Sequence, residues 1–72
     1  MDGLLKALQK KYEGDIAVGK ANIEVYLKNP AGIGEHPDIV EAVNTQVQLI
    51  ADAEDKLDVL LNHYTSELGN RW

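Results

Sequence analysis

The placement of proline divides this chain into two long stretches. Both prolines and two of the six glycines lie within residues 29–37. Such a cluster is typical of a loop, and the stretches on either side contain no proline. We therefore predict an all-α fold with a helix over about residues 3–28, a loop over 29–36 and a helix over about 37–68. All 72 residues then form a single domain.

Apolar residues in the first stretch recur at steps of three and four. The average step is close to the α-helical period of about 3.6 residues, which predicts an amphipathic helix capped by Asp2. Gly19 lies on the apolar stripe, where it would let another helix approach closely. Gly14, on the opposite face, either costs stability alone or breaks the helix, with Asp15 capping a second segment. The predicted stripe consists of Leu5, Leu8, Tyr12, Ile16, Gly19, Ile23 and Leu27.

The second stretch carries a heptad series of nine positions, in which steps of three and four alternate as in a coiled-coil seam. Pro37 suits the first turn of this helix, because its missing N–H costs nothing there. Glu54 is the single charged position in the series. We predict that it is a buried carboxylate that fixes register, paired with Lys11 or Lys20. The series is Val40, Val43, Val47, Ile50, Glu54, Leu57, Leu61, Tyr64 and Leu68, and Ile39, Ala53 and Leu60 widen it on one side.

Two long helices joined by a short loop are expected to fold back as an antiparallel helical hairpin. Residues 1–28 carry a net charge of +1 and residues 37–72 carry -5, which favours their pairing. A hairpin this small makes a poor core, and four apolar residues lie off the main stripes, at Val18, Val25, Leu49 and Val59. We therefore predict a homodimer that forms a four-helix bundle. Its core and dimer seam comprises Leu8, Tyr12, Ile16, Gly19, Ile23, Val43, Val47, Ile50, Glu54, Leu57, Leu61 and Tyr64.

The sequence contains no constellation that indicates catalysis, a cofactor or a metal centre. It has no Cys, and His63 with Glu67 supplies two ligands where zinc usually needs three or four. The acidic cluster at residues 52–58 is interpreted as a solvated face rather than an acid–base or magnesium site. The segment from Gly32 to Pro37 either offers N–H groups to an anion or forms a tight turn, and Glu35 favours the turn. The predicted turn residues are Gly32, Gly34, His36 and Pro37.

The partners expected from these features are a second copy of the chain and a protein. The net charge of -5 disfavours nucleic acid, although a dimer could bring two basic first helices together. Trp72 is either a packing residue at the bundle end or an anchor for a partner. No apolar run approaches the roughly 20 residues of a membrane helix, and no signal peptide is recognised, so a cytoplasmic location is expected.

Residues 20–37, followed by the stretch Ala53-Glu54-Asp55-Lys56-Leu57, resemble small accessory proteins of large tailed bacteriophages, especially marine ones. The likeness spans about residues 12–64, and Gly-Ile-Gly-Glu-His-Pro at 32–37 is its most specific part. It implies a phage accessory protein in the host cytoplasm and brings no catalytic residue. In architecture alone the chain is similar to Rop, a plasmid-encoded RNA-binding hairpin dimer. The sequence thus favours a non-enzymatic protein-interaction module, with a Rop-like RNA- or DNA-binding dimer as the alternative.

Overall fold

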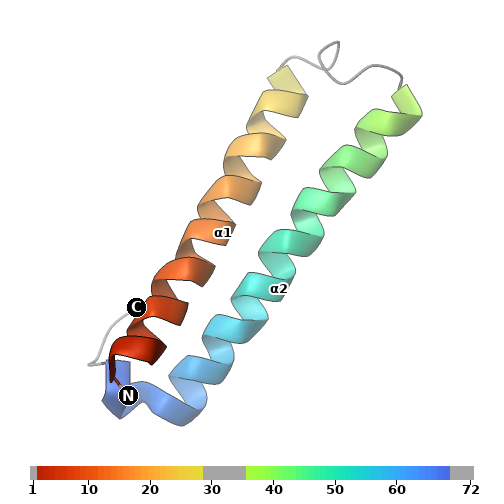
Figure 1. Cartoon of the computed structure of the whole chain (residues 1–72). Helices are drawn as coiled ribbons and strands as arrows, with labels where there is room; N and C mark the ends of the chain where they lie inside the picture. The colour runs from red at the N-terminus through yellow and green to blue at the C-terminus, as the bar shows by residue number, and fades with distance from the viewer. Residues whose placement is uncertain (1, 29–35, 69–72) are drawn as a thin grey trace.

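The structure is a computed structural model that describes residues 2–28 and 36–68. All of these residues lie in two helices, α1 (Asp2–Lys28) and α2 (His36–Leu68), which run antiparallel side by side (Figure 1). The predicted helical hairpin is therefore confirmed. Both helices begin one residue earlier than predicted, which is the usual uncertainty of a helix boundary. Pro37 occupies the first turn of α2, as predicted.

Gly14 does not interrupt α1, which is continuous from Asp2 to Lys28. The alternative in which Asp15 caps a second segment is therefore wrong. The helix begins at Asp2, the residue that was predicted to cap it. The predicted turn glycines Gly32 and Gly34 lie outside the described residues.

The two helices meet along stripes that both follow the heptad spacing of 3.5 residues per turn. Gln9 is 7% exposed and takes the place predicted for Leu8, which is 38% exposed. Tyr26 is half-buried in place of Leu27, which is exposed. The contact stripe of α1 is Leu5, Gln9, Tyr12, Ile16, Gly19, Ile23 and Tyr26.

In α2 the contact stripe lies about one position away from the predicted seam. Val43, Ile50 and Leu57 belong to both, but the alternate positions are taken by a neighbouring column of residues. Val40, Val47, Glu54, Leu61 and Tyr64 are exposed in the hairpin, which corrects the prediction that they line its seam. The contact stripe of α2 is Ile39, Val43, Gln46, Ile50, Ala53, Leu57 and Leu60.

Desolvation explains this rotation of α2. Each candidate column contains one polar residue, Glu54 in the predicted column and Gln46 in the observed one. A neutral amide costs less to bury than a carboxylate, and Gln46 finds a partner, because its Oε1 accepts a hydrogen bond from Asn22 Nδ2 of α1 at 3.0 Å. Glu54 stays exposed on the rim, so it is not the buried carboxylate that the heptad series predicted.

Gly19 allows a close approach of the two helices. A Cβ atom at this position would lie 2.6 Å from Ile50 Cγ1 and 3.3 Å from the Gln46 carbonyl oxygen. The packing role predicted for Gly19 is thus confirmed. Asn22 faces Gln46, Gly19 faces Ile50 and Tyr12 faces Lys56, so the numbers of facing residues add up to 68 or 69 along the hairpin.

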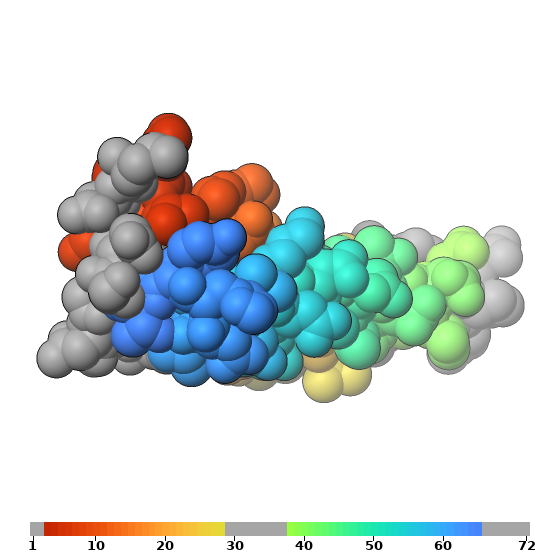
Figure 2. Space-filling model, turned by 90° about the horizontal axis from the view of Figure 1, so that it is seen from below, coloured from red at the N-terminus to blue at the C-terminus, as the bar shows by residue number. Residues whose placement is uncertain are grey.

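Helix α2 bends near its end, at Tyr64, whose φ of -133° and ψ of 29° are not helical. The Thr65 hydroxyl donates to the Leu61 carbonyl oxygen, a type of side-chain bond that often bends helices. Beyond the bend, α2 turns toward the start of α1 (Figure 1), and in Figure 2 the blue atoms of α2 lie beside the red atoms of the first turns of α1.

Candidate interaction surface

The helix–helix contact leaves two long faces of the hairpin, each formed by one flank of α1 and one flank of α2. One face contains a groove of about 570 Å³ near the N-terminus of α1. Leu4 and Leu8 line it from α1, and Lys56 and Val59 line it from α2, with four further lining residues. We call this side the mixed-charge face.

Each of these four residues belongs to a column, which is a set of residues of one helix that follow each other at intervals of seven. Residues with this spacing stay on one flank of a helix that packs with heptad periodicity. The columns through Leu4 and Leu8 together form a second seam on α1, in which steps of four and three alternate. That seam is Leu4, Leu8, Lys11, Asp15, Val18, Asn22 and Val25, and its counterpart on α2 is Ala42, Thr45, Leu49, Asp52, Lys56 and Val59.

The side chains of the mixed-charge face are ordered in bands along the hairpin. Because facing residue numbers add up to about 68, Val59 lies level with Leu8, and Leu49 lies level with Val18. Between these two apolar bands lies first a cationic band, Lys11 and Lys56, and then an anionic band, Asp15 and Asp52. From the open end of the hairpin the order is therefore apolar, positive, negative, apolar.

Local contacts hold the four charged side chains of these bands in place. Lys11 Nζ lies 3.1 Å from Asp15 Oδ2, one helical turn along α1. Lys56 Nζ lies over the Tyr12 ring, 5.6 Å from its centroid, and Asp52 Oδ1 accepts from Gln48 Nε2 at 2.9 Å. Lys11, Lys56 and Asp52 stay exposed and Asp15 is part-exposed, so all four groups remain accessible to a partner.

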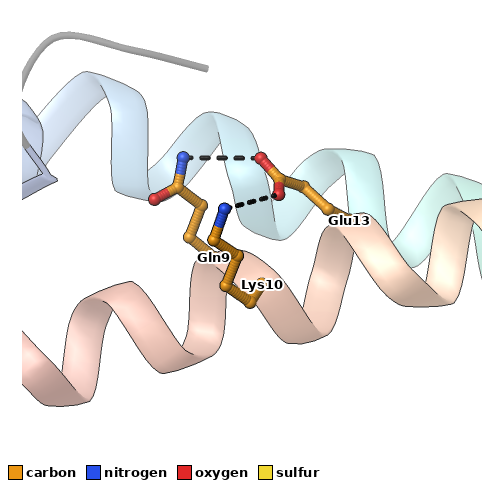
Figure 3. A network of polar contacts seen from close by, with 3 residues as sticks. All are labelled: Gln9, Lys10 and Glu13. Atoms are coloured by element: carbon orange, nitrogen blue, oxygen red, sulfur yellow. Dashed lines mark hydrogen bonds and ion pairs between the residues drawn. The ribbon is translucent and has the colours of Figure 1, made fainter.

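The opposite side is the acidic face, named for three carboxylates that line a groove of about 370 Å³. The groove is lined by Glu13 and Ile16 of α1 and by Glu54, Leu57, Asp58 and Leu61 of α2. Glu13 is held within its own helix, where Gln9 Nε2 donates to its Oε2 at 3.4 Å and Lys10 Nζ lies 3.8 Å from its Oε1 (Figure 3). Charged residues dominate the α1 flank of this face, at Lys6, Lys10, Glu13, Lys20 and Glu24.

The structure separates the predicted seam residues into two groups. Seven of them lie in the helix–helix contact, and five are exposed on the flanks. Glu54 and Leu61 line the groove of the acidic face, and Leu8 lines the groove of the mixed-charge face. Tyr64 also lines that groove, at the bend. Val47 lies seven residues before Glu54, on the same flank of α2. The seven in contact are Tyr12, Ile16, Gly19, Ile23, Val43, Ile50 and Leu57.

The sequence interpretation missed the four charged residues of the bands as a group. Their signal was present, because Lys11 is seven residues from Leu4 and from Val18, and Lys56 is seven from Leu49. The sequence interpretation assigned these residues separately instead, with Lys11 as a possible partner of Glu54, Asp15 as a possible cap and Asp52 as part of a solvated acidic face.

The structure gives no support to a metal site at His63 or elsewhere among the described side chains. His63 is exposed and its ring packs edge-on against Tyr64, 6.2 Å away and at 62°. Among the residues whose side chains the structure describes, no three potential ligands gather as a metal site would require. Neither described helix combines the length and apolar character needed to cross a membrane.

Comparison with protein families, with curated proteins and with solved structures found no match for this chain.

Proposed function

We propose that two copies of the hairpin associate into a four-helix bundle and that this dimer serves as a protein-interaction module. The observation that carries the proposal is how few apolar side chains the hairpin buries. Among the residues whose side chains are described, only Ala53 and Leu60 are buried apolar residues. Val18, Val25 and Val59 are each at least half exposed, whereas Leu49, the fourth residue expected to stay exposed in a monomer, is half-buried.

The accessible surface supports the same proposal. The hairpin exposes 5080 Å², whereas a folded chain of its mass is expected to expose about 4,400 Å². Its radius of gyration is 15.2 Å, against about 11 Å for a globular domain of this length. A second copy laid along the rod would cover the excess, and a closed two-fold pair is the commonest way to do so.

Sedimentation equilibrium over the micromolar range tests the proposal. We expect a mass twice the 7.9 kDa of the single chain. A monomer that unfolds cooperatively would contradict it and would show that one hairpin is sufficient. The function of the dimer is tested by affinity capture from the native host, with a dimer-deficient variant as the control.

A Rop-like nucleic-acid-binding dimer is the competing prediction. Exposed lysines of α1, such as Lys10, favour it, and the net charge of -5 opposes it. Titration with RNA and with duplex DNA at two salt concentrations separates the two functions, because binding to phosphates weakens steeply as salt rises. The phage origin and the cytoplasmic location remain predictions.

A further inference from the structure

We propose that the mixed-charge face is the dimer surface and that the second copy lies antiparallel on it. In this arrangement Lys11 lies over the partner's Asp15, and Lys56 lies over the partner's Asp52. The inference rests on the proposed dimer and deepens it, because it assigns the face, the orientation and the register.

The choice of face follows from α1, because both flanks of α2 carry exposed apolar residues, Val59 on the mixed-charge face and Val47 on the acidic face. A helix in a four-helix bundle packs against two neighbours and therefore needs two adjacent seams. On α1 the second seam is the one through Leu4, Leu8, Val18 and Val25, which keeps apolar residues at four of its seven positions. The other flank of α1 belongs to the acidic face and is mostly charged.

The orientation follows from the order of the bands. Consider a two-fold axis that lies in the interface, perpendicular to the helices and between the positive and negative bands. It reverses the order of the bands in the second copy, so that each positive band lies over a negative band and each apolar band lies over an apolar band. Lys11 then meets the partner's Asp15, and Leu8 meets the partner's Val18. The same axis brings Val59 of α2 over the partner's Leu49. A parallel second copy would instead place positive bands on each other and negative bands on each other, which is destabilising.

The size of the contact is sufficient for a dimer. The axis crosses α1 near its middle, so about 23 residues of the helix overlap, roughly 34 Å at 1.5 Å per residue. The hairpin is 16 Å across, which gives a footprint of roughly 550 Å² per copy and about 1,100 Å² in total before side-chain relief is counted, near the lower limit of stable interfaces.

Two valines of nearly equal exposure test the face. Val18 is 53% exposed on the mixed-charge face, and Val47 is 50% exposed on the acidic face. We expect Val18→Asp to sediment as a monomer at concentrations where the wild type is a dimer, and Val47→Asp to remain a dimer. Circular dichroism verifies that both variants stay helical. A wild-type dimer that is insensitive to Val18→Asp, or equally sensitive to Val47→Asp, overturns the assignment of the face.

Reversing the bands tests the orientation. The variant with Lys11→Glu, Asp15→Lys, Asp52→Lys and Lys56→Glu keeps opposite charges one turn apart in each helix but exchanges the two bands. An antiparallel dimer of this variant is as complementary as the wild type, whereas a mixed dimer with the wild type opposes like charges. Native mass spectrometry of the variant with ¹⁵N-labelled wild type should therefore show homodimers, with the mixed dimer depleted about tenfold or more. A statistical mixture, or a preference for the mixed dimer, overturns the antiparallel register.

The outcomes separate this inference from the function on which it rests. If the wild type is a monomer, the proposed dimer is wrong and this inference falls with it. If the wild type is a dimer but ignores Val18→Asp or the band reversal, the dimer stands and the assigned face or register is wrong.

Discussion

Gly19 and Gly14 show how one residue type has opposite effects at two positions of α1. Gly19 faces α2 at a distance that leaves no room for a side chain, whereas nothing lies within 4 Å of a Cβ atom built on Gly14. Alanine favours a helix over glycine by about 1 kcal/mol at either position. Only at Gly19 does overpacking oppose this gain, and the atoms that would have to move belong to a branched side chain and to backbone.

We predict that Gly14→Ala raises the free energy of unfolding by about 1 kcal/mol. Gly19→Ala should be less stable than Gly14→Ala by about 1–3 kcal/mol, and Gly19→Leu should disrupt the hairpin or its assembly. Urea denaturation of the two alanine variants measures the difference. Equal stabilisation at both positions would show that the close approach at Gly19 has no energetic weight.

The hydrogen bond between Asn22 and Gln46 is the second residue-scale feature with a measurable effect. It joins the helices at partly buried positions. If either side chain is removed, the other amide loses its hydrogen-bond partner on the facing helix. A double-mutant cycle with Asn22→Ala and Gln46→Ala should give a coupling energy of about 1 kcal/mol. A coupling near zero would mean that water replaces the missing partner without cost.

At the scale of the helix, the sequence predicted existence and extent better than rotation. The proline-rich segment and the long proline-free stretches located α1 and α2 to within a residue. The rotation of α2 depended on a choice between two neighbouring columns, each with one polar residue. Counting apolar positions does not resolve that choice, because the outcome depends on which polar residue finds a partner. On α1 the same difficulty put Leu8 on the stripe in place of Gln9, since a buried glutamine has no signature in an apolar pattern.

The exposed position of Glu54 changes what its replacement should do. Glu54 and Asp58 are like charges four residues apart on α2, and both line the acidic groove. We predict that Glu54→Gln stabilises the protein slightly, by about 0.2–0.5 kcal/mol, because that repulsion is removed. Thermal unfolding of this variant measures the gain, and a clear loss would indicate that the Glu54 carboxylate has a stabilising partner.

Glu54→Leu should stabilise to a similar extent but also cause a change that Glu54→Gln does not. A leucine there joins Val47 and Leu61 into an unbroken apolar column on the acidic face. We predict that Glu54→Leu forms mixed or higher oligomers in light scattering, whereas Glu54→Gln keeps the wild-type mass. If both variants keep that mass, the carboxylate does not protect this face from association.

For the whole molecule, folding and association should be linked if the dimer forms. A partner that binds only the folded chain stabilises it by mass action. We predict that the Tm of the wild type rises with protein concentration and that the Tm of Val18→Asp does not. Circular dichroism melts across the micromolar range provide the measurement. A wild-type Tm that does not change with concentration would contradict the proposed dimer.

The constant sum of facing residue numbers also bears on how the hairpin forms. Contacts near the connection, such as Asn22 with Gln46, join residues 24 apart in the sequence. Each contact farther from the connection closes a longer loop of chain, which contains all the contacts nearer to it. Once the inner contacts exist, the next pair closes only a slightly longer loop, at small entropic cost. The helices can therefore zip together from the connected end, so changes near Asn22 should slow folding while changes near Leu60 should mainly speed unfolding.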